Sequence, residues 1–598
     1  MAEGTTIACG PPSTICQVAV NHELRFGVDY EKSKNLKRTG AMYVYEAISL
    51  ALASEGIDVA FALMGDANQD LIVDLAERRG VRIINCRHEQ NVVAMADGYT
   101  RFSDGRIGLA LVTAGPGLTN TATSLVVAKC HRSPVLVLAG APPLDDLHNP
   151  QLFDQTGFAK LLAGASSTLE SPKVLDARLD LALGHIRRRR GPFVLNLPSN
   201  VQKMELPDGW SPQPRYSGYL PTIPAVGDLR RAAHCLVNAK GPAILAGQGA
   251  VRSGAAKAIA ACASELQAAI TTTLPAKGLC ADHPLWLGTC GGLSEGVALS
   301  ALNGWCDVLL VVGASMNQWT THHGALARDR QIIQLDTDLQ NVGAFHRAII
   351  ALYGDARSTL EALFEHVHAL LPTPRPRRDT FEEKIAALWR ANREPIFYET
   401  GRDGTIDPRQ AIRELDRLLP KNRLVVAAGG HAGYLICQLL AITSPSNWNY
   451  TIDFGALGQG LGIALGAAFA RPTERVYHLT ADGEFMMNLA DFHTAVNNAL
   501  PITIVILNDQ AFGQERHDLK HKNLPEKYAM QASPDFARLA EGFGARGVRF
   551  DTPESLADLE AALKDAEHAR APTVIDIRVN GAYEAPVSQE IAKALAGG

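Results

Sequence analysis

Short apolar runs alternate along the chain with longer amphipathic stretches, in three successive blocks. The first block contains DVAFALMG, RIINCR, IGLALVTAGPG, PVLVLAGAPP and PFVLNLPSN; the second contains GPAILAGQGA, DVLLVVGAS and QIIQLDTD; the third contains RLVVAAGG, RVYHLTADG, ITIVILND and PTVIDIRV. Continuous apolar strands separated by helices are typical of parallel sheets covered on both faces. The pattern therefore predicts an α/β protein with three doubly wound parallel-sheet domains.

Polar and proline-rich segments separate these blocks. The first and third blocks share a similar rhythm of strands and helices, which hints at an old duplication. The expected organisation is an N-terminal arm at 1–38, a first domain at 39–205, a linker at 206–225, a central domain at 226–371, a second linker at 372–404, a third domain at 405–585 and a C-terminal tail at 586–598.

Composition narrows the class of protein. The 598 residues are 46% hydrophobic and 20% charged with a net charge of −5, so no basic field attracts nucleic acid or an anionic membrane. No apolar run approaches the roughly 20 residues that cross a bilayer, and residues 1–38 lack a signal core. The ten cysteines form no C-x-x-C pair and predict reduced thiols. We expect a cytoplasmic protein with no nucleic-acid or membrane partner.

Two acidic strand ends indicate a metal site. Asp482 ends one strand of the third block, and Asp509 ends the next strand along the chain. A strand, its helix and the next parallel strand form one unit, so the two carboxylates can converge on one cation. Mg²⁺ prefers oxygen ligands and often takes some from phosphates, which Gly483 and the free N–H groups of the following helix start could approach. Alternatively, each aspartate only caps a helix or begins a turn.

The two strand ends together resemble the thiamine-diphosphate signature, which is Gly-Asp-Gly followed by Asn-Asn after 25–30 residues. Ala481 replaces the first glycine, and Asp509 replaces the second asparagine. Over residues 39–585 the chain resembles the acetolactate synthase and pyruvate decarboxylase group of thiamine-diphosphate enzymes. The resemblance implies that Asp482, Asp509 and the carbonyl of Ala511 hold Mg²⁺.

Two glycine-rich turns of the third block extend this resemblance. In AAGGHAGYL, it implies that Gly430 and His431 meet the diphosphate of the cofactor. In FGALGQGLG, it implies that the Gly455 carbonyl accepts a hydrogen bond from the aminopyrimidine and that Leu457 wedges the cofactor into a bent shape. Glu484 stands where a small residue is usual, and we expect it to cap a helix or restrain the cofactor turn.

The first block carries the element that would activate the cofactor. Glu89 follows the strand RIINC and enters a helix; alone, it is equally well explained as a charge at a helix N-terminus. The surrounding RHEQ, MADGYTRFSDG and VTAGPGLTN resemble the pyrimidine-binding domain of the family. There the glutamate bonds a pyrimidine nitrogen and promotes proton removal. Since this glutamate and the metal site occupy different domains, the resemblance implies a homodimer or homotetramer with active sites between subunits.

The expected substrate pocket mixes two family patterns. Glu515, in NDQAFGQERHDLKHKN, and Asp66, in MGDANQDL, resemble acids of the decarboxylases, whereas Gln155, in LFDQTGF, matches a synthase glutamine. Two carboxylates beside a reaction centre suit proton transfer, because burial and mutual repulsion raise the pKa of one of them. The alternative is a surface turn for Asp66 and a solvated helix for Glu515.

The central block resembles the FAD-carrying domain of the synthases. Its turns AGQGA, GTCGGLSEG, VVGAS and QLDTDLQNVG occupy the corresponding positions. The arginine and paired aspartates that follow VVGAS in the synthases are replaced here by MNQWTTHHG. The sequence therefore does not favour FAD.

These observations favour an enzyme that uses thiamine diphosphate and Mg²⁺ to cleave or form a carbon–carbon bond of a small 2-oxo acid, by decarboxylation with or without carboligation. Two alternatives on the same scaffold are a 2-hydroxyacyl-CoA lyase and a cyclic-dione hydrolase. A third, of another class, is a non-catalytic regulatory subunit that binds thiamine diphosphate. Glu89 argues against the third, since a subunit without catalysis has no need of a proton-activating carboxylate.

Overall fold

The computed structural model describes residues 42–188, 191–207, 209–213, 221–294, 296–371, 379–392 and 397–589. The expected arm at 1–38 lies outside the described residues, as does the tail from residue 590 onward.

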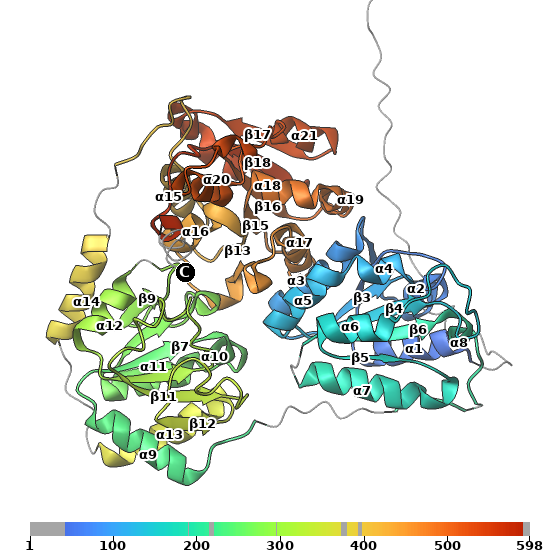
Figure 1. Ribbon diagram of the computed structural model, residues 1–598, viewed down its shortest axis with the longest axis horizontal. Helices are drawn as coiled ribbons and strands as arrows, with labels where there is room; N and C mark the ends of the chain where they lie inside the picture. Colours follow the sequence, from blue (N-terminus) through green and yellow to red (C-terminus); the bar gives the residue numbers. More distant parts are fainter. Residues whose placement is uncertain are drawn as a thin grey trace, which may run out of the picture. The chain divides into compact units, whose positions relative to one another are not determined.

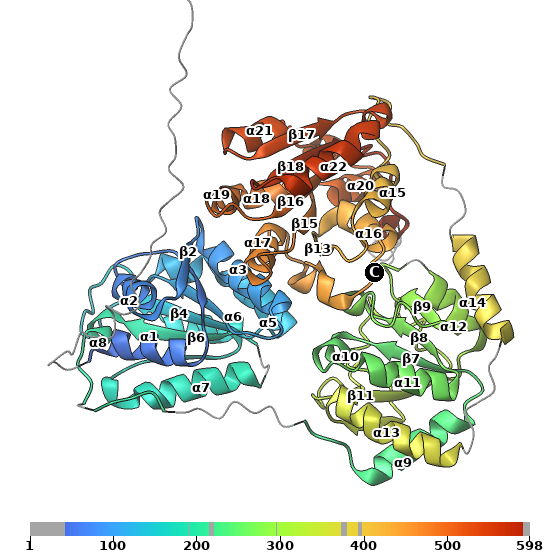
Figure 2. The ribbon, with the colours of Figure 1, turned by 180° about the vertical axis from the view of Figure 1, so that it is seen from behind.

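Three six-stranded sheets, all with parallel pairing, form the framework of the chain (Figure 1). The strand orders are β2-β1-β3-β4-β6-β5, β12-β11-β10-β7-β8-β9 and β14-β13-β15-β16-β18-β17. Figure 2 shows helices on both faces of each sheet. The predicted fold class is confirmed, and each sheet falls within one of the three predicted blocks.

The first domain buries apolar side chains on both faces of its sheet. Its strands are β1 Val59–Ala62, β2 Arg82–Asn85, β3 Gly108–Val112, β4 Val135–Ala141, β5 Ser166–Thr168 and β6 Phe193–Pro198. Its helices are α1 Val44–Ser54, α2 Gln69–Arg79, α3 Glu89–Phe102, α4 Pro116–Thr119, α5 Ala122–His131, α6 Gln155–Ala163, α7 Leu175–Arg187 and α8 Ser199–Gln202, with the 3₁₀ turn η2 Pro172–Val174. One core contains side chains of α1, α2 and α7, and the other contains those of α3, α5 and α6.

The central domain has its first strand in the middle of the sheet. Its strands are β7 Pro242–Ala246, β8 Ala269–Thr272, β9 Trp286–Thr289, β10 Val308–Val312, β11 Gln331–Asp336 and β12 Ile350–Tyr353. Its helices are α9 Val226–Asn238, α10 Gln248–Arg252, α11 Ala256–Leu266, α12 Val297–Trp305 and α13 Ala356–Leu370, with η3 Leu274–Ala276. This is the strand order of a dinucleotide-binding sheet.

The third domain contains strands β13 Leu424–Ala427, β14 Trp448–Tyr450, β15 Val476–Ala481, β16 Ile502–Asn508, β17 Arg546–Phe550 and β18 Thr573–Arg578. Its helices are α15 Pro408–Leu418, α16 Gly430–Leu439, α17 Gly460–Ala470, α18 Asp482–Met487, α19 Phe492–Asn497, α20 Gly513–His521, α21 Phe536–Gly542 and α22 Leu559–His568. Its 3₁₀ turns are η4 Pro445–Asn447, η5 Asp453–Gly455, η6 Leu489–Asp491, η7 Glu526–Tyr528 and η8 Pro553–Asp558.

The first and third sheets have the same strand order once the strands of each are counted from its own start. The central sheet has a different order. The shared rhythm of the first and third blocks in the sequence therefore corresponds to a shared topology. In both sheets, the loops at the carboxyl ends of the strands carry the residues singled out from the sequence, which is where ligands bind to parallel sheets.

Three segments differ from the expectation. The predicted linker at 372–404 contains the helix α14 Asp379–Asn392, whose Ile385 is buried in the central domain and whose Trp389 stacks on Trp286. The stretch expected to be one helix after Asp482 is divided into α18 and α19 by η6. The predicted tail begins with Val587 and Ser588 buried against the third domain.

Packing accounts for the glycines of the central turns. A Cβ at Gly247 would lie 2.3 Å from the Gly313 carbonyl oxygen, and one at Gly249 would lie 2.7 Å from the Gly313 Cα. The turns AGQGA and VVGAS thus need glycine because they press against each other, whether or not a nucleotide binds there. Among the described residues, no helix is both long and apolar enough to cross a membrane.

Candidate active site

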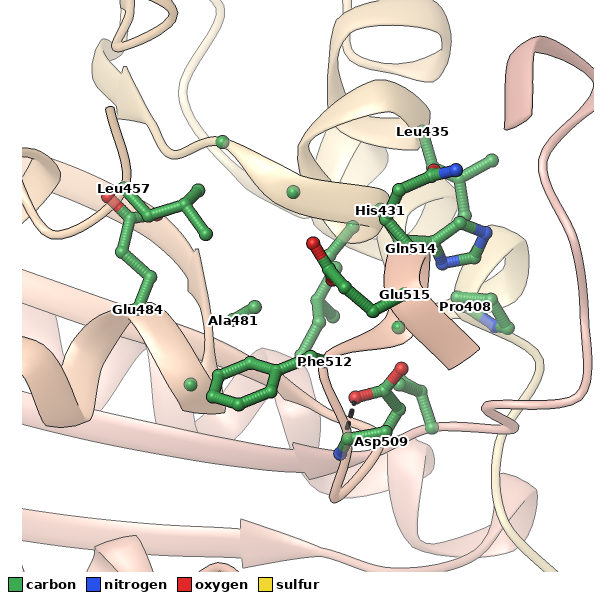
Figure 3. A pocket seen from close by; sticks show the side chains of 18 of the residues that line it. Pro408, His431, Leu435, Leu457, Ala481, Glu484, Asp509, Phe512, Gln514 and Glu515 are labelled. Atoms are coloured by element: carbon green, nitrogen blue, oxygen red, sulfur yellow. Dashed lines mark hydrogen bonds between the residues drawn. The ribbon is translucent and has the colours of Figure 1, made fainter. Parts of the chain in front are cut away.

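A cleft opens at the carboxyl ends of the strands of the third sheet, the usual place for a ligand on a parallel sheet (Figure 3). The loops after β13, β15, β16 and β18 and the start of α20 supply most of its wall. The lining residues are Pro408, Gly429, Gly430, His431, Ala432, Leu435, Leu457, Ala481, Gly483, Glu484, Leu507, Asp509, Ala511, Phe512, Gly513, Gln514, Glu515, Val579 and Asn580.

Asp482 and Asp509 stand at the ends of two adjacent strands, because β15 and β16 pair with Ala481 opposite Leu507. Asp482 is fully buried; its Oδ2 accepts a 2.5 Å hydrogen bond from the Ser533 hydroxyl, while its Oδ1 has no hydrogen-bond partner in the described structure. Burial and the negative charge of Asp482 raise the pKa of Asp509 to about 7. The topology thus brings the two predicted metal ligands together.

This pair has the properties of an oxygen site for a hard cation. A buried carboxylate oxygen without a partner costs free energy, and a carboxylate whose pKa is raised by a second carboxylate is stabilised by a cation between them. Within the described residues, no group of three or more His, Cys, Asp and Glu side chains could hold a metal. A cation here would therefore also need the Ala511 carbonyl and oxygens from a ligand, as Mg²⁺ commonly does. Gln510, which lies between Asp509 and Ala511, has a φ of 54°. This backbone conformation is sparsely populated and is often found at functional sites.

Helix α16 directs its N-terminus at the same cleft. Gly430, its first residue, has φ of 82°, and both Gly430 and His431 line the cleft. The free N–H groups and the dipole of a helix start favour an anion such as a phosphate. The residues expected to meet a diphosphate are therefore placed where the backbone is suited to bind one.

The protonation of His431 follows from its contacts. Burial and the neighbouring His517 lower the pKa of His431 to about 3, so the ring is neutral near pH 7. Its Nε2 accepts a 3.0 Å hydrogen bond from the Ala585 N–H, which leaves the ring proton on Nδ1. His431 can therefore donate through Nδ1 to an acceptor in the cleft. Ala585 belongs to the segment after β18, and nothing in the sequence pattern placed it at the site.

His517 was also missed from the sequence. Its ring centroid lies 4.7 Å from that of His431, and neither of its buried ring nitrogens has a side-chain hydrogen-bond partner in the described structure. Burial, above all, lowers the pKa of His517. The two histidines are 86 positions apart along the chain, so no local motif could signal their contact.

The residues 453–460, here called the wedge segment, form another wall of the cleft. Leu457 lines the cleft, and a Cβ on Gly429 would lie 2.9 Å from Leu457 Cδ2, so the leucine packs on the bare Cα of that glycine. Phe454, Gly455 and Gly458 have φ of 63°, 65° and 74°. This irregular backbone projects an apolar side chain into the cleft, as expected for Leu457.

Glu484 connects the start of α18, which carries Asp482, to the wedge segment. Its Oε1 accepts a 3.1 Å hydrogen bond from the N–H of Gly460, the first residue of α17, while its Oε2 is buried without a partner in the described structure. Burial raises the pKa of Glu484 to about 7, although hydrogen bonds from backbone N–H groups such as that of Gly460 oppose the shift. Glu484 was expected either to cap a helix or to restrain the cofactor turn. The structure places its carboxylate against the start of α17, a different helix from its own, beside the cofactor turn.

Glu515 approaches the cleft from α20. Its side chain is exposed in this chain, and its carboxyl group points into the cleft, as Figure 3 shows. Neighbouring Gln514 is fixed by the Ser588 hydroxyl at 2.8 Å and by Asp518 at 2.9 Å. Glu515 lies on an exposed part of α20, as the alternative interpretation expected, but it also borders the same cavity as Asp509.

Three predicted residues belong to the first domain and do not line this cleft in the described chain. Glu89 begins α3 and accepts a 3.0 Å hydrogen bond from the Asn120 amide. Asp66 lies exposed after β1, with its Oδ1 3.4 Å from the Thr113 hydroxyl. Gln155 is buried, accepts from the Gly115 N–H at 3.1 Å and donates to the Gly140 carbonyl and to Asn196. These contacts lie at the carboxyl edge of the first sheet, and those of Gln155 hold the glycine turn after β3.

Comparison with protein families accounts for this arrangement. Three family models match: the N-terminal TPP binding domain of thiamine pyrophosphate enzymes at 42–161, their central domain at 229–363 and their C-terminal TPP binding domain at 428–577. The chain belongs to the thiamine pyrophosphate enzymes. It is therefore an enzyme dependent on thiamine diphosphate (ThDP), and the cleft lies within the domain that matches the C-terminal TPP binding domain.

Curated relatives extend over nearly the whole chain. The acetolactate synthase isozyme 3 large subunit of Escherichia coli is 29% identical, over 90% of this chain and 94% of its own length. A probable acetolactate synthase large subunit of Methanocaldococcus jannaschii is 28% identical, over 91% and 93%. A probable 2-ketoarginine decarboxylase of Pseudomonas aeruginosa is also 28% identical, over 93% and 97%. The resemblance to acetolactate synthases is thus confirmed at the level of the family.

Proposed function

We propose that this enzyme uses ThDP and Mg²⁺ to cleave the bond between the carboxylate and the carbonyl carbon of a small 2-oxo acid. The observation that carries the proposal is the buried pair Asp482 and Asp509, with its partnerless oxygen, at the rim of a cleft that also receives the N-terminus of α16. A cation would neutralise the carboxylate pair, and an anion would suit the start of α16. A diphosphate bound through Mg²⁺ supplies both.

The chain's own residues would hold the cofactor as follows. Asp482, Asp509 and the Ala511 carbonyl hold Mg²⁺, while the N–H groups at the start of α16 and the Nδ1–H of His431 face the diphosphate. When bound, ThDP supplies a nucleophilic carbon and an electron sink for cleavage beside a carbonyl. Leu457, which lines the cleft, would pack against the cofactor, and the Gly455 carbonyl would be available to accept a hydrogen bond from it.

Glu89 requires a second copy of the chain. It does not border the cleft in the described residues of its own chain, and we assign it to the cleft of a partner in a homodimer or homotetramer. There its carboxyl group would bond the pyrimidine of the cofactor and would hold or move the proton needed to activate it. Asp66 and Gln155, at the same edge of the first sheet, would come with it, Asp66 as an acid near the substrate and Gln155 as the support of the glycine turn.

Glu515 is the proposed proton donor to the product. It borders the cavity, and no ion pair neutralises it in the described part of the chain. Asp518, one turn further along α20, also has no ion-pair partner there. Two such acids favour a substrate with a polar or cationic side chain. The P. aeruginosa relative, named for a 2-oxo acid that carries a guanidinium group, makes that class a specific second candidate beside pyruvate.

The test is acid-quench proton NMR of the holoenzyme with ThDP, Mg²⁺ and either pyruvate or a 2-oxo acid bearing a guanidinium group. A covalent adduct between cofactor and substrate, together with released CO₂, supports the proposal. The variant Glu515→Gln should accumulate the adduct and release product at least about tenfold more slowly, because the proton donor is missing. Glu541→Gln, an exposed glutamate on α21, is the matched control and should behave like the wild type.

One result would overturn the proposed substrate class, and another would overturn the proposed role of Glu515. Bound ThDP with no adduct from either acid would exclude 2-oxo acids of these kinds and leave the 2-hydroxyacyl-CoA lyase and the cyclic-dione hydrolase to be tested. Equal turnover of Glu515→Gln and Glu541→Gln would remove Glu515 from the reaction.

A further inference from the structure

A partly buried polar network joins the first domain to the start of the wedge segment. Arg101, at the C-terminal end of α3, donates through Nη1 to Asp453 Oδ2 at 3.0 Å. His131, the last residue of α5, bonds the same oxygen through Nδ1 at 3.0 Å. Asp453 therefore receives hydrogen bonds from two helices. No sequence motif of the family pointed to this contact.

The other end of the network fixes the arginine. Arg101 binds both carboxylate oxygens of Asp97, one turn earlier on α3, at 2.7 Å each, and Asp97 Oδ1 also accepts from the Ser133 hydroxyl at 2.5 Å. A bidentate pair of this kind sets the plane of the guanidinium group. Nη1 is thereby held in the direction of Asp453, and it also donates to Asn449 at 3.3 Å.

The charges of the network are complementary. Burial alone would raise the pKa of Asp453, but His131 and Arg101 hold it well below its usual range, so the carboxylate remains charged. Burial and the charge of Arg101 lower the pKa of His131, which is therefore neutral near pH 7. Because a carboxylate only accepts, His131 Nδ1 carries the proton in this contact.

Asp453 lies immediately before the strained part of the wedge segment. Phe454, with φ of 63°, is a bulky residue in the left-handed region, a strained conformation that persists only when its surroundings hold it. The Phe454 side chain is 63% exposed, so its own packing in this chain does not supply that support. The support comes from the neighbours along the chain, of which Asp453 is the one anchored by charge.

The far end of the wedge segment is held as well. Gln90 donates to the Gly458 carbonyl at 3.1 Å, the Ser124 hydroxyl donates to Gln459 at 2.8 Å, and Glu484 accepts from Gly460. The strained residues at 454 and 455 therefore lie between two fixed ends. Loss of the contacts of Asp453 would free the part of the backbone that carries the Gly455 carbonyl. The start of α18, which carries Asp482, would stay in place.

We propose that Asp453, held by Arg101 and His131, is a positioning residue that fixes the wedge segment so that the Gly455 carbonyl and the Leu457 side chain meet the aminopyrimidine of ThDP. This inference rests on the proposed function of the cleft. Asp453 itself does not line the cleft and acts through the backbone that follows it. Its loss should therefore affect the activation of bound cofactor far more than the binding of the diphosphate end.

The test measures two quantities without substrate: the Kd for ThDP, by calorimetric titration of the full-length protein in the presence of Mg²⁺, and the exchange of the thiazolium C2 proton with deuterium in the loaded enzyme, by acid-quench NMR. Asp453→Ala should slow the exchange by about tenfold or more, because small misplacements of reacting groups cost large factors in rate, with Kd changed by less than about threefold. Asp453→Asn keeps one side-chain oxygen that can accept from both Arg101 and His131, and should stay within about twofold of the wild-type exchange rate.

The chain offers a closely matched control. Arg423 and Asp416 form a comparable pair in the third domain, with side chains 4% and 23% exposed, against 3% and 24% for Arg101 and Asp453. Asp416→Ala should lower Tm as Asp453→Ala does but leave the C2 exchange unchanged. His131→Phe keeps the ring volume and the Arg101 contact, and should slow the exchange by about threefold; it tests the proposal even if Asp453→Ala does not fold.

Each outcome is decisive. An Asp453→Ala variant that exchanges its C2 proton as fast as Asp416→Ala refutes the positioning role, as does a loss of ThDP affinity as large as the loss of exchange rate. If the wild-type protein does not accelerate the exchange over free ThDP in the presence of Mg²⁺, the proposed function itself fails and this inference fails with it.

Discussion

Acid should remove the contribution of one buried histidine, beneath the cleft, to the stability of the third domain. His478, in the middle of β15, is fully buried, and its Nδ1 bonds the Val426 carbonyl at 3.0 Å. Burial lowers the pKa of His478 from 6.5 to about 4. The folded domain therefore keeps this ring neutral at a pH where the unfolded chain would protonate it.

The sign and size of the effect follow from that difference. A base with a depressed pKa in the folded state stabilises the fold fully above pH 6.5, and the contribution is lost as pH falls from 6.5 towards 4. The complete loss corresponds to about 3 kcal/mol, of which about 2 kcal/mol is gone at pH 5. For a domain of this size, the contribution of His478 alone corresponds to a decrease in Tm of about 4–8 °C between pH 8 and pH 5. Glu484 and Asp509, whose pKa values are raised to about 7, act in the opposite direction, so the effect of His478 is isolated by comparing a variant with the wild type.

The assay is thermal unfolding of the protein from pH 5 to 8 without added cofactor, comparing wild type with His478→Asn. The asparagine amide can still donate to the Val426 carbonyl but does not titrate. When pH is lowered from 8 to 5, the change in Tm of the variant should therefore be more favourable than that of the wild type by about 4–8 °C. Replacing His568, exposed on α22, by asparagine controls for the loss of a histidine at the surface. A difference in Tm between wild type and His478→Asn that stays constant from pH 5 to 8 would refute the reasoning.

Three further predictions concern the cleft and the helix pair beside it. Asp482→Asn should weaken Mg²⁺ binding about 10- to 100-fold, measured by calorimetry with ThDP present; unchanged affinity would place the cation elsewhere. Leu457→Ala should slow C2 proton exchange about tenfold while ThDP affinity changes less than about threefold; an equal loss of both would mean that Leu457 only fills space. Gly466→Ala should lower the free energy of unfolding by about 1–3 kcal/mol, since a Cβ there would lie 2.2 Å from the Met95 carbonyl oxygen, whereas Gly227→Ala, with open space around it, should not.

The sequence predicted the parallel sheets and the convergence of Asp482 with Asp509 because both depend on local rules. Apolar strands with helices between them specify parallel pairing, and consecutive parallel strands end at the same edge of a sheet. The glycine turns were located by the same logic. For this part of the site, position along the chain is nearly equivalent to position in space.

The contacts that were missed join distant segments. His517 meets His431, the Ala585 N–H sets the tautomer of His431, and Arg101 reaches Asp453, which is 352 positions away. None of these pairs lies within one strand–helix–strand unit, so no spacing rule connects them. Glu484 was noticed because it departs from the family pattern, but its partner, Gly460, could be identified only from the packing of α17 against the metal turn.

The pair of helices α3 and α17 explains how those distant contacts are held in register. Gly98 of α3 and Gly466 of α17 lie where a Cβ would approach the backbone of the other helix, at 2.2 Å from the Ile463 and Met95 carbonyl oxygens respectively. Such close approach of the two backbones allows little sliding between the helices. One end of α3 carries Glu89 and the other carries Arg101, while α17 continues directly from the wedge segment. A shift of α3 that displaced Glu89 would therefore also disturb Asp453, so the helix pair couples the placement of the activating glutamate to that of the wedge segment in the same chain.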